Sequence, residues 1–186
     1  LLIIILTNDN RIFPVTVKGK ILIVEDSVDT VELLNKRLTF EGYSTLLAYN
    51  GTQGLEQATK NNPALIILDI MMPGMDGFEV TRALKADVHT NDIPIILITA
   101  YDMADYKVIG HEAGADEFLN KPIKAPELKS RVKSLLRTKE YQEKLKLQKQ
   151  AESDRICDNK EKTLYGENAR PSVLLVFEEE KYSESI

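Results

Sequence analysis

Cysteine, histidine and tryptophan are scarce in this sequence, which has one cysteine, two histidines and no tryptophan. The single thiol, Cys157, cannot form an internal disulfide, and such a composition is typical of the reducing cytoplasm, where we expect the chain to reside. Cys157 lies in a polar stretch without a nearby histidine, which favours an incidental thiol over a nucleophile. His89 and His111 are too isolated to indicate a metal site.

Long hydrophobic runs and excess positive charge are also missing. The apolar run at residues 1–6 is far shorter than the about 20 residues that span a bilayer and lacks the basic start of a signal peptide, so we expect no membrane partner. Three interpretations of this run stay open: a strand, the end of an upstream element or a mistranslated extension. We therefore treat residues 1–19 as an N-terminal extension of unclear structure. The net charge of -5 argues against direct nucleic-acid contact.

Residues 20–137 alternate between strand-like and helix-like patterns. Short apolar runs predict five strands, and helical spacing of apolar residues follows each of them. The predicted strands are residues 21–24, 45–49, 64–68, 94–98 and 115–119. This alternation indicates a doubly wound α/β fold, in which helices cover both faces of a five-stranded parallel sheet. Functional sites in such folds lie outside the carboxyl ends of the strands.

Polar residues follow four of the five predicted strands. Glu25 and Asp26 come after the first, Asp69 after the third, Thr99 ends the fourth and Lys121 follows the fifth. Adjacent carboxylates repel one another unless a cation joins them, and oxygen ligands suit Mg²⁺. A carboxylate can attack a phosphoryl group, whose oxygens a lysine and a hydroxyl can then hold. The pattern therefore predicts a magnesium-dependent phosphoryl site.

Four motifs in the same order resemble the receiver domain of bacterial two-component response regulators, in the CheY-like superfamily. They are residues 21–27, 68–77, 98–100 and 117–122, and the resemblance covers about residues 20–137. It implies a flavodoxin-like sheet with strand order 2-1-3-4-5, followed by a C-terminal helical extension.

The resemblance also implies how the acidic residues act. Asp69 would be the phosphoacceptor, and Glu25, Asp26, Asp69 and the backbone carbonyl of Met71 would bind Mg²⁺. Taken from the residues alone, Asp69 could be a solvated loop carboxylate. Glu25 and Asp26 could simply be an acidic pair that favours the dipole of the following helix.

The remaining site residues receive roles from the same resemblance. Lys121 would pair with the phosphoryl group, and the bond that joins it to Pro122 would be cis. Thr99 would bind a phosphoryl oxygen, and Phe118 would move together with Thr99. Without the resemblance, Thr99 could be a strand-end hydroxyl and Phe118 an ordinary core residue. Met71 and Tyr101 follow the phosphoacceptor and Thr99 by two positions, and because neither can orient an attacking water, we expect a long-lived phosphoryl group.

The implied function is a signalling switch, with at most self-phosphorylation and self-dephosphorylation activity. A histidine kinase or phosphotransfer protein would supply the phosphoryl group. The face formed by the fourth helix, fifth strand and fifth helix would respond, and it offers a possible homodimer surface. A haloacid-dehalogenase-type phosphatase would need a second aspartate at position 71, where this chain has Met71. The third hypothesis is a binding module that uses the fold without the chemistry.

The C-terminal third has a different composition. Residues 138–170 are rich in Lys, Glu and Gln and are expected to form a polar helical linker, with a flexible connection from Asp154. Residues 173–176 repeat the apolar pattern of residues 21–24. Residues 171–186 are therefore either the start of a second, degenerate receiver-like domain, a lone strand or a disordered tail.

Overall fold

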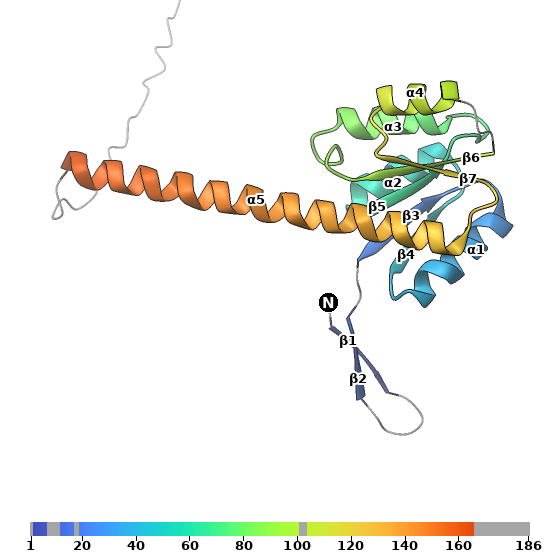
Figure 1. Ribbon diagram of the computed structural model, residues 1–186, viewed down its shortest axis with the longest axis horizontal. Helices are drawn as coiled ribbons and strands as arrows, with labels where there is room; N and C mark the ends of the chain where they lie inside the picture. The colour runs from blue at the N-terminus through green and yellow to red at the C-terminus, as the bar shows by residue number, and fades with distance from the viewer. Residues whose placement is uncertain (1, 7–11, 17–18, 101–103, 166–186) are drawn as a thin grey trace, which may run out of the picture. The chain divides into compact units, whose positions relative to one another are not determined.

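A five-stranded parallel sheet forms the centre of the fold (Figure 1). The computed structural model describes residues 2–6, 12–16, 19–100 and 104–165. The strands of this sheet are β3 (Lys20–Val24), β4 (Ser44–Ala48), β5 (Leu65–Asp69), β6 (Ile95–Thr99) and β7 (Glu117–Asn120). They pair in the order β4-β3-β5-β6-β7, and all four pairings are parallel. The predicted order 2-1-3-4-5 is confirmed.

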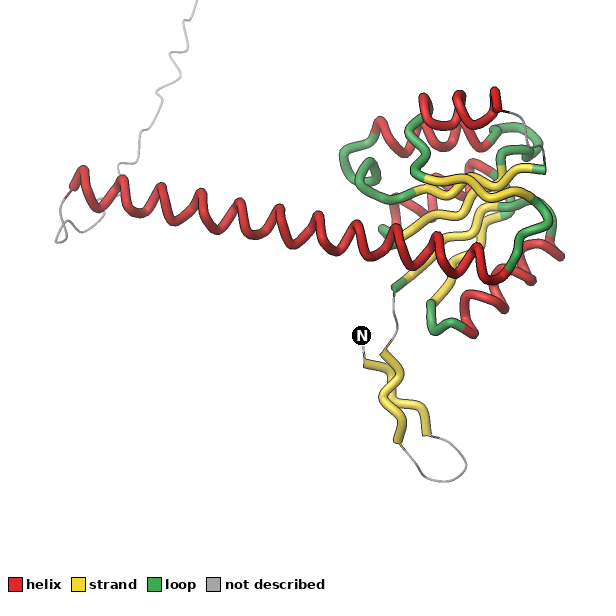
Figure 2. The backbone as a smooth tube through the Cα atoms, viewed as in Figure 1, coloured by secondary structure: helices red, strands yellow, loops and turns green. Residues whose placement is uncertain are grey.

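Helices cover both faces of the sheet (Figure 2). They are α1 (Val28–Phe40), α2 (Gly51–Asn61), α3 (Gly77–Ala86), α4 (Ala104–Glu112) and α5 (Ala125–Tyr165). Side chains of α2, α3 and α4 share one core cluster with alternate strand residues, and side chains of α1 and α5 share the other cluster with the remaining strand residues.

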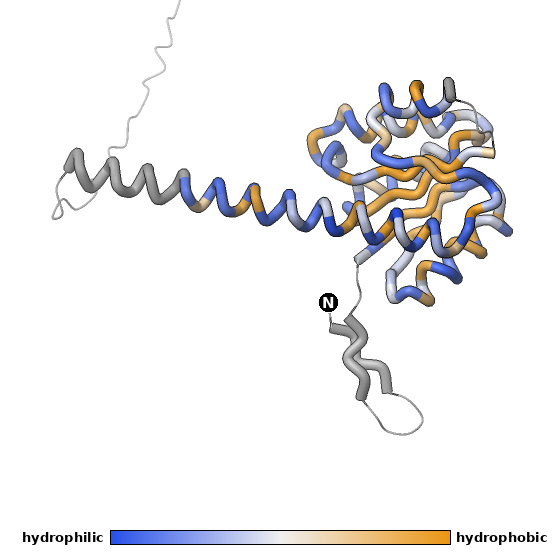
Figure 3. Tube along the Cα trace, in the orientation of Figure 1, coloured by the Kyte–Doolittle hydropathy of each residue, from blue (hydrophilic) through white to orange (hydrophobic). Residues whose placement is uncertain are grey.

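The continuous apolar runs of the central strands follow from this double covering. Every residue of β5 and β6 is buried, including the side chains on both faces. Figure 3 shows apolar residues concentrated along the sheet, whereas the part of α5 that is coloured is mostly polar beyond its first turns. Full burial of a Leu or Ile side chain contributes about 1.5–3 kcal/mol, so these strands supply much of the stability of the fold.

Side-chain caps determine where three of the helices begin. Ser27 and Asn50 accept hydrogen bonds from the backbone at the starts of α1 and α2. Asp76 forms a capping box with Glu79 at the start of α3. Helix α2 ends at Asn62 in the left-handed conformation, directly before Pro63.

The structure corrects the sequence prediction near the C-terminus. A flexible connection from Asp154 is wrong, because α5 continues as a helix to Tyr165. Lys, Glu, Gln and Leu favour helix even without a packed face, so polarity alone did not indicate a break. The predicted repeat at residues 171–186 lies outside the described residues, as does Tyr101.

Two other features complete the described backbone. Residues 2–6 form β1, which pairs antiparallel with β2 (Ile12–Thr16), in agreement with the strand alternative for the first apolar run. The chain divides into two units, Leu1–Tyr141 and Gln142–Ile186. Within the described part, none of the helices combines the length and hydrophobicity that crossing a membrane requires.

Candidate functional site

The carboxyl ends of four strands converge at one edge of the sheet. Val24 is the register partner of Leu68, so Glu25 and Asp69 follow at neighbouring positions of β3 and β5. Thr99 ends β6 opposite Asn120 of β7, and Lys121 comes next in the chain. The backbone N–H of Lys121 donates to the carbonyl of Thr99 at 2.7 Å. The sheet thus brings together residues that are far apart in sequence.

Three carboxylates form an acidic cluster at this edge. One oxygen each from Glu25, Asp26 and Asp69 lies within 4.8 Å of the others. Glu25 and Asp69 are only 1% and 3% exposed, whereas Asp26 is exposed to solvent. Buried carboxylates at this separation need a nearby cation, because burial weakens the solvation that otherwise offsets their repulsion.

Lys121 supplies positive charge to the two buried carboxylates. Its Nζ lies 2.9 Å from Oδ2 of Asp69. The same nitrogen lies 2.8 Å from Oε2 and 3.1 Å from Oε1 of Glu25, and only the contact with Oε1 has hydrogen-bond geometry. Lys121 therefore bridges β3 and β5 from the loop after β7.

Burial and charge shift the pKa values of this group. Burial, with a further contribution from the charge of Asp69, raises the pKa of Glu25 above its ordinary value despite the hydrogen bond from Lys121. Burial alone would lower the pKa of Lys121, but the hydrogen bonds and charges of Glu25 and Asp69 together raise it. The raised pKa of Lys121 thus follows from its contacts with two carboxylates, whereas the raised pKa of Glu25 follows chiefly from burial.

The site fits a hard divalent cation. Among the described residues, Oδ1 of Asp69 and Oε2 of Glu25 are the buried side-chain oxygens that lack a hydrogen-bond partner. Buried oxygens that accept no hydrogen bond are costly, and a cation bound between these two and Asp26 would satisfy them, beside the Lys121 ammonium at 2.8 Å from Oε2 of Glu25. Oxygen ligands with one solvent-exposed member suit Mg²⁺, which retains several waters. Met71 follows Asp69 by two residues, and its side chain is 53% exposed.

Thr99 and Phe118 lie near one another on β6 and β7 but in different environments. Thr99 is 1% exposed at the end of β6. Phe118, half-buried, pairs with Leu97 in the sheet register and contacts His111 edge-to-face, with ring centroids 5.0 Å apart. A Cβ at Gly110 of α4 would overlap the Phe118 ring, so the glycine makes room for it. The peptide bond between Lys121 and Pro122 is cis, as the resemblance implied.

Three contributions to the site were not assigned from the sequence. A Cβ at Gly77 would overlap the Asp69 carbonyl, so this glycine lets α3 approach the end of β5 closely. The His111 ring packs edge-to-face on Phe118. Arg37 of α1 donates to the carbonyl of Ile123, two residues after Lys121. The glycine in the motif was a usable signal, but the other two contacts depend on tertiary packing.

Comparisons with known proteins agree with this geometry. Response regulator PleD of Caulobacter vibrioides is 46% identical over 121 residues, which is 65% of this chain and 27% of PleD. The uncharacterized transcriptional regulatory protein YkoG of Bacillus subtilis is 43% identical over 121 residues, 64% of this chain and 52% of YkoG. The chain therefore spans about half or less of the length of these curated relatives.

Solved structures lead to the same family. The signal receiver domain of a signal transduction histidine kinase from Syntrophus aciditrophicus superposes with a TM-score of 0.61 at 41% identity, covering 64% of this chain and 91% of that domain. A family model described as the response regulator receiver domain matches residues 21–133. The chain therefore belongs to the receiver domain family of two-component response regulators, which are signalling domains.

Proposed function

We propose that the chain is a phosphoryl-accepting switch of a two-component phosphorelay and that Asp69 carries the phosphoryl group. The observation that supports this most directly is the environment of Asp69. Its Oδ1 is buried without a hydrogen-bond partner, while its Oδ2 lies 2.9 Å from Lys121. The Asp69 carboxylate thus keeps one oxygen without a hydrogen bond and lies beside a cation that can stabilise the transferred group.

The transfer requires few parts from the protein. The Asp69 carboxylate attacks phosphorus, the bond from phosphorus to the donor's histidine nitrogen breaks, and that imidazole leaves and takes up a proton from solvent. Lys121 pairs with a phosphoryl oxygen, and the hydroxyl of Thr99 donates to another. Mg²⁺ held by Glu25, Asp26, Asp69 and the Met71 carbonyl would supply positive charge to the oxygens of the site.

The donor in this proposal is a histidine kinase or a phosphotransfer protein in the cytoplasm. Small phosphorylated anhydrides such as acetyl phosphate can serve in vitro, with acetate as the leaving group. The protein contributes positioning and charge, so its own activity is limited to self-phosphorylation and self-dephosphorylation. A phosphatase function has less support than a phosphoryl-accepting switch, because Met71 cannot protonate a leaving group.

The phosphoryl group would act on the face formed by α4, β7 and α5. Phosphorylation adds about -1.5 to -2 charges at the sheet edge, where Thr99 and Lys121 respond. Phe118 of β7 contacts His111 and borders Gly110, so a move of its ring must affect α4. Val108 and Ile109 of α4 are 57% and 42% exposed, which suits a possible homodimer through this face.

The C-terminal residues have a separate place in the proposal. Helix α5 begins four residues after Lys121, so the helix beyond residue 137 is a direct route for the signal to an output. Residues 138–165 would act as a helical linker. Residues 171–186 would begin a second receiver-like unit, and sequence beyond Ile186 with the alternation of strands and helices would support this.

The phosphorylated state should be long-lived. Met71 has a half-exposed thioether side chain and offers no carboxylate or amide to orient water on the phosphoryl group. Decay of the phosphorylated protein, followed by intact-mass spectrometry after removal of the donor, should take many minutes. Loss within seconds would contradict this prediction.

The proposed function is tested with acetyl phosphate. The full chain should gain one phosphoryl group per molecule in the presence of Mg²⁺ and none after chelation with EDTA. The variant Asp69→Asn should gain none under either condition, while its circular dichroism stays that of the parent. An unchanged mass of the parent chain, or equal labelling of the variant, would refute the proposal.

A further inference from the structure

The loop between β7 and α5 determines where Lys121 lies. It comprises residues 121–124, and it must hold the Lys121 ammonium within 2.9 Å of Asp69. The first residue of the loop is fixed by the hydrogen bond from the Lys121 N–H to the Thr99 carbonyl at 2.7 Å. At the other end, Lys124 accepts a hydrogen bond from Leu128 within the first turn of α5. Pro122 and Ile123 lie between these two ends.

Arg37 of α1 provides a contact at this point. Its Nη1 donates to the carbonyl oxygen of Ile123 at 2.6 Å, across a separation of 86 residues in sequence. A hydrogen bond from a charged donor is shorter and stronger than one between neutral groups. The Arg37 side chain is half-buried, so solvent competes only in part for this carbonyl.

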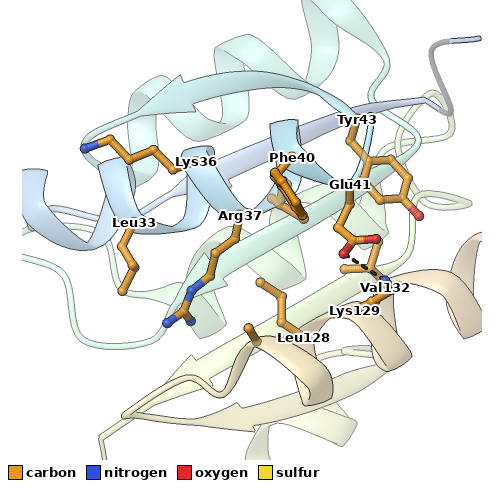
Figure 4. Close-up of a pocket in the computed structure, with 11 residues that line it drawn as sticks. Leu33, Lys36, Arg37, Phe40, Glu41, Tyr43, Leu128, Lys129 and Val132 are labelled. Atoms are coloured by element: carbon orange, nitrogen blue, oxygen red, sulfur yellow. Dashed lines mark hydrogen bonds and ion pairs between the residues drawn. The ribbon is translucent and has the colours of Figure 1, made fainter. Parts of the chain in front are cut away.

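Packing of the Ile123 side chain also ties this part of the loop to α1. The Ile123 side chain is 9% exposed and shares a core cluster with Val31, Leu34 and Leu38 of α1. A groove of about 410 Å³ lies between part of α1 and the first turns of α5, and Arg37 and Leu128 are among the residues that line it. Figure 4 shows the Arg37 side chain extending from α1 beside Leu128 in this groove. The hydrogen bond from Arg37, which lines the groove, therefore ties the loop backbone to α1 in addition to the packing of the Ile123 side chain.

We propose that Arg37 is a positioning residue for phosphoryl transfer, acting through the Ile123 carbonyl on Lys121. This inference rests on the proposed function, since it concerns the same site. Arg37 itself does not contact the carboxylates; it restrains the loop from which Lys121 reaches them. Phosphoryl transfer depends on position, and small displacements of a stabilising cation lower the rate substantially.

The main test compares two neighbouring substitutions on α1. Arg37→Met keeps a long apolar stem and removes the donors, and it should lower the initial rate of phosphorylation by acetyl phosphate and Mg²⁺ about tenfold. Lys36→Met removes an equal charge one residue away, from a side chain that is 76% exposed and pairs with Glu32. That control should keep the parent rate. Arg37→Lys, which retains a cationic donor, should recover part of the rate.

A double-mutant cycle separates positioning from a general effect on folding. In a Lys121→Ala background, Arg37→Met should cause no further loss of rate, because the residue through which Arg37 acts is gone. The proposal would be overturned if Arg37→Met lowered the phosphorylation rate by the same factor in the parent and in the Lys121→Ala background. It would also be overturned if Arg37→Met were phosphorylated at the rate of the parent chain. If Arg37→Met does not fold, the same comparison is made with Arg37→Lys.

A measurement without phosphorylation keeps this inference distinct from the proposed function. In two-dimensional NMR spectra of the full chain, Arg37→Met should shift the backbone amide signals of Lys121 and Ile123, whereas Lys36→Met should leave them in place. If the parent chain is not phosphorylated, the proposed function fails by itself. Unshifted Lys121 and Ile123 signals in Arg37→Met would overturn the positioning role, whatever the rate.

Discussion

Glu25 shows how a single buried residue couples stability to function. The pKa of Glu25 in the folded chain lies above its ordinary value of 4.5, chiefly because the side chain is buried. The folded state therefore binds this proton more tightly than the unfolded state does. Stability contributed by the protonated carboxyl is present at low pH and is lost as the pH rises through the pKa of the folded state. At neutral pH the ionised group costs stability.

Replacing Glu25 with glutamine tests this coupling. The variant keeps the shape of the side chain and removes the charge, so without Mg²⁺ it should be more stable than the parent at about pH 7, by about 1 kcal/mol. At about pH 4 the advantage should disappear. Urea unfolding at the two pH values measures the difference. A variant that is less stable than the parent at about pH 7 would contradict the predicted sign.

Lys121 has the opposite effect on the same group of charges. Lys121→Met would leave the buried carboxylates of Glu25 and Asp69 without the ammonium that contacts both. Because the lysine side chain is 28% exposed, the expected loss is about 2 kcal/mol, less than for a fully buried pair. Added Mg²⁺ should restore much of it. Thermal unfolding with and without Mg²⁺ measures both changes, and no loss in the metal-free variant would contradict the account.

The sequence could predict these charged residues but not all of their neighbours. Glu25, Asp69 and Lys121 each follow a predicted strand, and parallel strands end at one edge, so their proximity follows from the fold class. The contact between Arg37 and Ile123 joins residues 86 positions apart without any pattern in either segment. Contacts of this kind depend on how α1 and the β7–α5 loop pack, which local sequence does not determine.

At the scale of elements, the start of α3 controls the end of β5. The backbone N–H of Glu79 donates to the Asp76 carboxylate at 2.7 Å and the backbone N–H of Asp76 donates to the Glu79 carboxylate at 3.0 Å, which fixes where the helix begins. Gly77, which directly follows Asp76, donates its N–H to the Ile70 carbonyl. A Cβ at Gly77 would lie 2.8 Å from the Ile70 Cα. The helix and the strand that carries Asp69 are therefore in direct backbone contact.

Gly77→Ala should disturb the phosphoacceptor from this position. The added Cβ would overlap the Asp69 carbonyl, and backbone atoms cannot move aside as a flexible side chain would. We expect a loss of about 1–3 kcal/mol in stability and a slower phosphorylation rate. Gly74→Ala is a suitable control, because its positive φ brings backbone strain but no atom lies within 4 Å of the added Cβ. An equal phosphorylation rate in both variants would contradict the proposed contact.

The elements also show where sequence patterns work. The buried strands were predictable because both faces of the sheet are covered, which requires continuous apolar runs such as residues 64–68. Helix α5 was predicted too short, because its polar C-terminal part lacks the regular spacing of apolar residues that indicates a helix. The pairing of β1 with β2 was not predicted either, because β2 contains Pro14 and has no alternation typical of a strand.

At the scale of the whole molecule, the site and both core clusters lie in the unit Leu1–Tyr141. The last residue in contact with a core cluster is Leu136. A chain that ends after Tyr141 should therefore fold and accept phosphate at a rate within about twofold of the full chain. Stopped-time phosphorylation assays on both chains test this. If the shortened chain were phosphorylated ten times more slowly than the full chain, this prediction would be wrong.

The central claim is that Asp69 forms an acyl phosphate, and reductive trapping tests it most directly. Borohydride converts an aspartyl phosphate to homoserine, so a chain treated with acetyl phosphate and Mg²⁺ and then with borohydride carries a permanent mark. Peptide mass spectrometry should find homoserine at position 69 and unchanged aspartate at positions 26 and 76. Homoserine at another aspartate, or none in a chain that has gained phosphate, would contradict the account.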